Sequence, residues 1–159
     1  LWIANGESVW CEKRDNSRKI FNLEAKNCLS NMKLVTSKNH GNRTLIDLIK
    51  NLNFEKVIKM GSIGCKLAAL IRGEGDVYIG LSLPGETSPK DWDFAAPEVI
   101  LKGSGGAITN INNKELIYGQ KNFEQKGLII ASNNKQIHKD ICLQIKETIV
   151  RNNLDNITL

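Results

Sequence analysis

Apolar side chains recur at helical spacing in several segments of the chain. Residues 45, 46, 48, 49 and 52 are all Leu or Ile, and Asn42 or Thr44 stands where an N-cap would begin this helix. Residues 63–72 combine small and apolar side chains, which is typical of a buried helix. The pattern therefore predicts helices over residues 45–52, 63–72, from 92 to the glycines at 105 and 106, and 137–149.

Short apolar runs between these helices predict strands at residues 33–37, 57–60, 76–80, 107–110, 115–118 and 128–131. The last run is fully apolar, as in strands buried on both faces. Asn5-Gly6 joins residues 1–4 to residues 8–12 and is a strong signal for a type I′ hairpin turn. Residues 13–30 and 82–91 are predicted to form loops. Because strands alternate with helices, we expect an α/β fold with helices on both faces of a central layered sheet.

Composition and charge narrow the class of protein. The 159 residues are 41% hydrophobic and 25% charged, which is ordinary for one globular domain. The net charge of +5 fits either a solvated basic surface or an anionic ligand attracted at long range. The chain has no run of five basic residues, no basic stripe and no interleaved aromatics, so we expect no nucleic-acid partner. No apolar run approaches the ~18 residues of a membrane span, so we expect no membrane partner.

The cysteines at positions 11, 28, 65 and 142 show no C-x-x-C pair, and no Cys/His group has zinc spacing. This pattern predicts free, buried thiols in a reducing compartment, and we expect a cytoplasmic protein.

A possible anion site lies where a strand turns into a helix. Gly61, Ser62 and Ile63 precede Lys66 by about one helical turn. Unpaired N–H groups and the helix dipole attract anions at such a position, and Ser62 and Lys66 would add a hydrogen bond and a charge. An ordinary helix cap with a solvated lysine explains the same residues.

A candidate metal ligand stands at the start of the helix that begins at Trp92. Asp93 is followed by the small residues Ala95 and Ala96, which allow a close approach of backbone or ligand. Apolar residues 99–101 are expected to form the buried face of the helix. A carboxylate fixed on a rigid element is suited to hold a divalent cation.

The run W-D-F-A-A-P, with the glycines at 103–106, resembles the second signature of the inositol-monophosphatase superfamily of Mg-dependent phosphatases. The resemblance implies that Asp93 is a ligand of Mg²⁺. It also implies that Gly61, Ser62, Ile63 and Lys66 belong to the substrate-binding segment. Residues 127–133 resemble the last strand of the family, which is structural, and Asp76 resembles a structural position.

The branch of 3′(2′),5′-bisphosphate nucleotidases is the most similar. Residues 37–40, Ser-Lys-Asn-His, resemble a segment whose histidine lies near the adenine, so His40 is expected to contact the base. Lys90, just before the aspartate, could meet a phosphate or remain solvated. Gly80 stands where an arginine is common in this branch, and one phosphate contact is therefore in doubt. The implied substrate is a nucleotide bisphosphate, such as adenosine 3′,5′-bisphosphate, and the implied context is sulfur metabolism.

The first metal motif of the family, D-P-x-D-G-T, is absent from the chain. We therefore expect a C-terminal half, with residues 1–30 as the junction and residues 31–159 as the substrate-binding domain. Its partner would be a missing N-terminal half, and exposed apolar surface could also favour a homo-oligomer. Alone, it is expected to have little or no phosphatase activity. The alternatives are an inositol monophosphatase, a sugar bisphosphatase acting on another small phosphate monoester, or a non-catalytic nucleotide- or anion-binding module.

Overall fold

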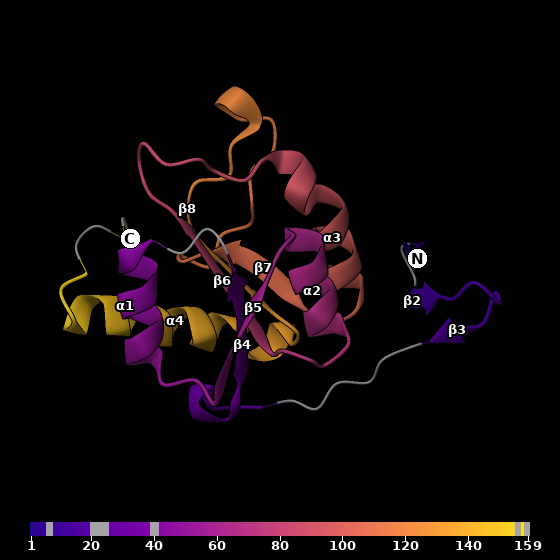
Figure 1. The fold of residues 1–159 in the computed structure, drawn as a ribbon, viewed down its shortest axis with the longest axis horizontal. Coiled ribbons are helices and arrows are strands. Elements are labelled where there is room, and N and C mark those ends of the chain that lie inside the picture. Colours follow the sequence, from indigo (N-terminus) through magenta and orange to yellow (C-terminus); the bar gives the residue numbers. More distant parts are fainter. Residues whose placement is uncertain (6–7, 20–25, 39–41, 155–156, 158–159) are drawn as a thin grey trace.

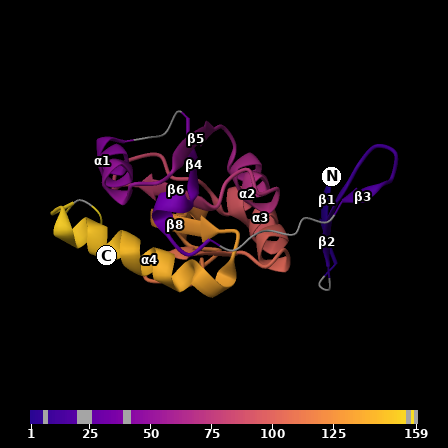
Figure 2. The same ribbon diagram turned by 90° about the horizontal axis from the view of Figure 1, so that it is seen from below.

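The computed structural model describes residues 1–5, 8–19, 26–38, 42–154 and 157. Within these residues, a small antiparallel sheet has the order β1-β2-β3, and a larger sheet has the order β5-β4-β6-β8-β7. Figures 1 and 2 show the small sheet to one side of the layered body. Its strands are β1 Trp2–Ala4, β2 Val9–Glu12 and β3 Arg18–Lys19.

The body follows the predicted alternation of strands and helices. Its strands are β4 Lys33–Ser37, β5 Lys56–Met60, β6 Val77–Ser82, β7 Ala107–Asn110 and β8 Gly127–Ser132. Its helices are α1 Arg43–Leu52, α2 Ile63–Ile71, α3 Asp91–Gly103 and α4 Lys135–Arg151, with 3-10 turns η1 Leu29–Asn31 and η2 Lys121–Phe123. The Asn42 side chain accepts the Leu45 N–H at 2.8 Å, which confirms Asn42 rather than Thr44 as the cap of α1.

The strand order places a ligand crevice at one edge of the sheet. β4 lies between β5 and β6 and runs parallel to both, while β8 is antiparallel to β6 and to β7. The chain leaves β4 toward β5 and then returns to pair β6 on the other side of β4. Open α/β sheets bind ligands at the carboxyl ends of strands where the strand order reverses in this way.

Alternating side chains of the sheet build two cores, one on each face. Leu34, Ile79 and Ile130 point to the face covered by α1 and α4. Val35 and Ile129 point to the opposite face, which α2 and α3 cover. Figures 1 and 2 show these helix pairs on opposite sides of the sheet, so the predicted layering is confirmed.

Three local predictions were wrong. Residues 114–118 form no strand, because side-chain contacts with α3 rather than a ladder hold this segment. Residues 13–30 are not all loop, since β3 and η1 lie among them. Val99 is 59% exposed, because three consecutive residues cannot share one face of a helix with 3.6 residues per turn. Leu101 is buried as predicted, and Phe94, one position after Asp93, joins it on the buried face of α3.

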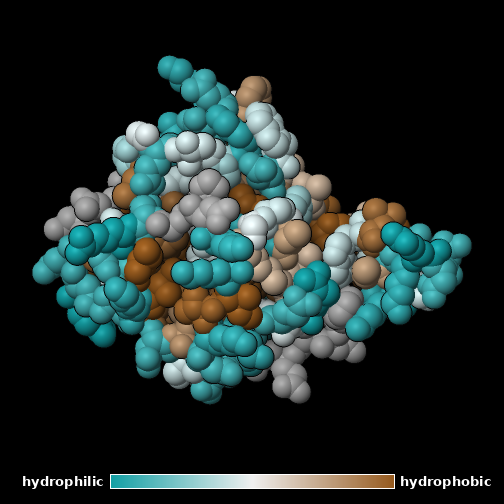
Figure 3. Space-filling view, in the orientation of Figure 1, coloured by the Kyte–Doolittle hydropathy of each residue, from teal (hydrophilic) through white to brown (hydrophobic). Residues whose placement is uncertain are grey.

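The surface carries a hydrophobic patch and two exposed cysteines. Figure 3 shows hydrophobic residues gathered between α1 and β5, with hydrophilic residues around them. All four cysteines are free, but only Cys142 is buried and Cys28 and Cys65 are exposed, which corrects the expectation of buried thiols. Among the described residues, no helix combines the length and hydropathy that crossing a membrane requires.

Candidate functional site

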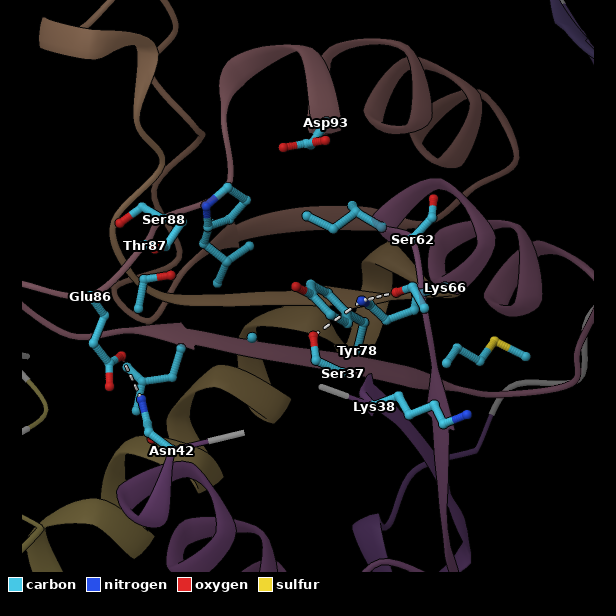
Figure 4. Close-up of a pocket in the computed structure, with 18 of the residues that line it drawn as sticks. Ser37, Lys38, Asn42, Ser62, Lys66, Tyr78, Glu86, Thr87, Ser88 and Asp93 are labelled. Carbon is cyan, nitrogen blue, oxygen red and sulfur yellow. Dashed lines mark hydrogen bonds between the residues drawn. The ribbon is translucent and has the colours of Figure 1, made fainter. Parts of the chain in front are cut away.

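A cavity of about 800 Å³ opens at the carboxyl ends of β4, β5 and β6 (Figure 4). The antiparallel β8 contributes its first residues to the same wall. The loop between β6 and α3 and the N-terminal ends of α2 and α3 complete it. The polar side chains around this cavity include those of Ser37, Lys38, Asn42, Ser62, Lys66, Tyr78, Glu86, Thr87 and Asp93.

The turn into α2 forms one side of this cavity. Ser62 is the N-cap, and its hydroxyl accepts the Cys65 N–H at 3.4 Å. The backbone N–H groups of Ile63 and Gly64 donate to no described residue in the structure. Both the cap and the anion interpretation of this turn therefore fit the geometry, since a capped helix still presents free N–H groups.

Lys66 is 3% exposed and lies at the base of the cavity. Its ammonium donates to the Ser37 hydroxyl at 3.1 Å and to the Gly61 carbonyl. No carboxylate of the described residues forms an ion pair with it. Burial lowers the pKa of Lys66, and the negative charge of Asp93 opposes that shift. A buried cation without a paired anion is costly, which makes this position suited to an anionic ligand.

Asp93 is exposed at the first turn of α3 and lines the same cavity as Lys66. One carboxylate oxygen, Oδ2, accepts the Lys90 backbone N–H at 2.8 Å. The other oxygen accepts no hydrogen bond from the described residues. In Figure 4 this carboxylate lies across the cavity from the turn at Ser62.

The structure brings together Gly61, Ser62, Ile63, Lys66 and Asp93 but not Lys90. The Lys90 ammonium binds Glu124 at 3.1 Å and the Asn122 carbonyl at 3.1 Å, outside the cavity wall.

His40 lies outside the described residues, so its contact with a base stays a prediction. The neighbouring Lys38 lines the cavity, although Figure 4 shows its ammonium turned away from Tyr78.

Sequence reasoning missed several polar groups of the wall, among them Glu86 and Tyr78. Glu86 lies in the loop after β6, and its Oε2 accepts from Asn42 Nδ2 at 2.9 Å and from the Leu83 N–H at 3.0 Å. These two bonds lower the pKa of Glu86 and keep it ionised. The second group is the hydroxyl of Tyr78. The only signal for Glu86 was a polar loop at the carboxyl end of a strand, which is where such sheets bind ligands.

One carboxylate of this wall has the chemistry of a metal ligand. The carboxylate of Asp93 is a hard oxygen donor with one free oxygen, as a magnesium ligand should be. Across the described ranges, no group of three or more His, Cys, Asp or Glu side chains could hold a metal ion. Asp93 thus fits as one member of a shared donor set.

Comparison with known proteins agrees with this geometry. The model of the inositol monophosphatase family matches residues 2–149. The 3′(2′),5′-bisphosphate nucleotidase 1 of mouse is 34% identical over 107 residues, which cover 66% of this chain and 33% of that protein. The human protein of the same name is 33% identical over 103 residues, or 64% of this chain and 32% of its own. This chain therefore spans about a third of the length of these relatives.

The fold has a counterpart among solved structures. The crystal structure of staphylococcal IMPase-II superposes with a TM-score of 0.70 at 19% identity, covering 98% of this chain and 57% of that chain. At that identity the likeness shows the fold alone. Since the family model matches residues 2–149 of the 159, the chain belongs to the inositol monophosphatase family.

Proposed function

We propose that this chain is the substrate-binding part of a Mg²⁺-dependent phosphatase that hydrolyses a nucleoside 3′(2′),5′-bisphosphate, such as adenosine 3′,5′-bisphosphate. The observation that carries the proposal is one cavity with a buried ammonium at its base and a half-free carboxylate at its rim. Lys66 suits a phosphate, and Asp93 suits a cation that the phosphate would share. The names of the mouse and human relatives support the substrate class.

The chain's own groups have distinct parts in this proposal. The free N–H groups at the start of α2 and the Lys66 ammonium bind and orient the phosphate. Asp93 holds one coordination position of a Mg²⁺ ion, whose charge would neutralise phosphate oxygens and lower the pKa of a bound water. Further ligands would be supplied by water, by the substrate phosphate and by carboxylates from outside the described residues, among which no group of three or more metal-binding side chains occurs.

The far side of the cavity supports recognition of the rest of the substrate. Glu86 is held by Asn42 and a backbone N–H, so its Oε1 faces no described donor. A fixed carboxylate accepts hydrogen bonds from hydroxyl or amino groups and repels phosphate. In Figure 4 Glu86 lies apart from Lys66. The cavity therefore has one end suited to phosphate, at Lys66, and another suited to hydrogen-bond donors, at Glu86.

The Glu86 end of the cavity also fits a second candidate function. An inositol or sugar ring presents several hydroxyl donors to Glu86, so an inositol monophosphatase or a sugar bisphosphatase fits this carboxylate as well as a nucleoside does. The solved structure of staphylococcal IMPase-II shares the fold.

The experiment is a turnover assay on the full-length protein that carries this chain, with adenosine 3′,5′-bisphosphate and inositol 1-phosphate compared at equal Mg²⁺. We expect a kcat/KM at least about tenfold higher for the nucleotide, which corresponds to about 1.4 kcal/mol of transition-state binding. A preference for inositol 1-phosphate would select the second candidate. Tight nucleotide binding without turnover and without metal dependence would instead indicate a binding module.

A further inference from the structure

Tyr78 is a buried residue whose hydroxyl forms no hydrogen bond with any residue in the described part of the chain. It lies on β6 with 2% of its surface exposed, and its ring packs in the core under α2 and α3. Figure 4 shows the hydroxyl directed to the open middle of the cavity, beside Lys66 and Ser37. Such a hydroxyl is a donor prepared for a ligand, because buried polar groups in folded proteins are nearly always paired.

Gly80 creates the room that this hydroxyl occupies. Tyr78 and Gly80 point to the same face of β6, because side chains alternate along a strand. A Cβ at position 80 would lie 2.2 Å from the Tyr78 Oη and 2.8 Å from its Cζ. Any side chain at position 80 would therefore displace the tyrosine from its present position.

The cation beside Tyr78 defines which ligand group the hydroxyl can meet. The Lys66 Nζ lies 5.8 Å from the centre of the Tyr78 ring. Two of its hydrogen bonds go to Ser37 and to the Gly61 carbonyl, so one N–H is free for a ligand. An oxyanion that accepts from this N–H lies next to the aromatic ring. Burial, together with the charge of Asp93, raises the pKa of Tyr78, and the hydroxyl therefore stays protonated and able to donate.

We propose that Tyr78 is a substrate-binding residue whose hydroxyl donates a hydrogen bond to an oxygen of the phosphate group bound by Lys66, in space that Gly80 provides. The inference rests on the proposed function, because it assumes a phosphorylated ligand in this cavity.

The test measures ligand affinity by calorimetry on the full-length protein without metal, with inorganic phosphate and adenosine 3′,5′-bisphosphate as probes. Tyr78→Phe keeps the ring and removes only the hydroxyl. We expect the Kd of both probes to rise about tenfold, as for loss of a hydrogen bond to a charged group. The melting temperature of the free protein should change little. Tyr118→Phe is the matched control, because that hydroxyl bonds Glu98 outside the cavity and its loss should leave both Kd values unchanged.

Two further variants separate the outcomes. Lys66→Met should raise the Kd of both probes more than Tyr78→Phe does. Unchanged affinity in Tyr78→Phe, combined with weakened affinity in Lys66→Met, would overturn the role of Tyr78 and leave the proposed function intact. Absence of phosphate binding by the unmodified protein, both without metal and with Mg²⁺ added, would overturn both. If Tyr78→Phe does not fold, Gly80→Ala displaces the same hydroxyl, and unchanged affinity in that variant would overturn the role instead.

Discussion

At the scale of single residues, the cavity wall carries two opposite charges, Lys66 and Asp93, that are not paired with each other. Lys66 is buried and bonded only to neutral oxygens, while Asp93 is exposed and bonded to a backbone N–H. A stability argument alone would favour a direct ion pair or an apolar replacement at these positions. The arrangement is better explained by ligands of both signs between them, a phosphate at Lys66 and a cation at Asp93.

The first prediction concerns Asp93→Asn in the full-length protein. The amide oxygen can still accept the Lys90 N–H, so folding should be preserved, while the negative charge is lost. We expect kcat/KM to fall by more than the roughly 10- to 100-fold that loss of an outer ligand partner costs at metal sites. Asp140→Asn, an equal charge change on the exposed face of α4, is the control and should retain full activity. Full activity in Asp93→Asn would remove Asp93 from the site.

The second prediction compares two glycines. A Cβ at Gly61 meets no atom within 4 Å, so Gly61→Ala should leave stability unchanged or raise it by about 0.4–1 kcal/mol. Because Gly61 lines the cavity, the added methyl should weaken phosphate binding. A Cβ at Gly106 would lie 2.6 Å from the Ser132 carbonyl and from Leu101, so Gly106→Ala should cost about 1–3 kcal/mol. Urea unfolding measures both, and a strongly destabilised Gly61→Ala would contradict the description of the turn.

At the scale of elements, side chains connect α3 to the segment between β7 and β8. Asp91, buried at the start of α3, accepts the Gly119 N–H at 2.7 Å and Gln125 Nε2 at 2.6 Å. Lys102, near the end of α3, forms ion pairs with Glu98 at 2.6 Å and with Glu115 at 2.9 Å. These contacts hold the segment between β7 and β8 against α3. They explain why residues 115–118, apolar enough for a strand, form none.

The third prediction concerns Asn42, which caps α1 and donates to Glu86. Asn42→Ala removes both bonds and should lower the free energy of unfolding by about 1 kcal/mol, as is typical of a lost N-cap. Asn42→Asp can still cap the helix, so it should retain most of that stability while repelling Glu86. Chemical denaturation distinguishes the two variants. Equal destabilisation by both would show that the bond to Glu86, rather than the cap, carries the energy.

At the scale of the whole molecule, a buried polar cluster joins β7, β8 and α4 on the face opposite α2 and α3. His138 is 2% exposed, with Nδ1 2.9 Å from the Ser132 hydroxyl and Nε2 2.9 Å from the Thr109 hydroxyl. The Ser132 hydroxyl also donates to the Asn134 carbonyl, and the Thr109 hydroxyl to the Asn110 carbonyl. Burial lowers the pKa of His138 and keeps the imidazole neutral at pH 7. The cluster therefore connects the last strand pair to the closing helix through an uncharged ring.

The fourth prediction follows from the pKa of His138, which burial lowers from 6.5 to about 4. Above pH 6.5 the ring is neutral in both folded and unfolded chains, and stability is complete. Between pH 6.5 and pH 4 only the unfolded chain takes up the proton, so the free energy of unfolding should fall by about 3 kcal/mol in total. Below pH 4 this residue should cause no further loss.

Urea titrations at several pH values measure this dependence. The His138→Gln variant lacks the titrating ring and serves as the control. Its stability should decline less between pH 6.5 and pH 4 than that of the unmodified protein. Parallel curves for the two proteins would contradict the assignment to His138.

The fifth prediction concerns the 159 residues in isolation. Asp93 is one carboxylate, and no cluster of three or more metal-binding side chains exists among the described residues. The isolated chain should therefore hydrolyse adenosine 3′,5′-bisphosphate with Mg²⁺ at well under a tenth of the rate of a full-length relative. A turnover assay on the purified chain measures this. A rate within tenfold of the relative would show that the remaining metal ligands lie in this chain after all.

Much of the fold could be predicted from the sequence because its elements are locally encoded. The spacing of isoleucines in α4, the Asn42 cap and the apolar run of β8 each depend on residues within one or two turns of the chain. The turn at residues 61–66 and the aspartate at 93 were found in the same way, since both motifs are continuous. The sequence determined these pieces, the layered fold class and the likeness to the family.

Only the tertiary structure decided how these pieces meet. Strand pairing in the order β5-β4-β6-β8-β7 joins segments far apart in the chain, and no local signal specifies it. The same long-range contacts put Lys66 opposite Asp93, direct Lys90 to Glu124 instead of the cavity, and expose Val99. They also place Tyr78 and Glu86 on one wall, where the burial of each group, and therefore its charge and its free hydrogen bonds, depends on neighbours that the order of residues does not reveal.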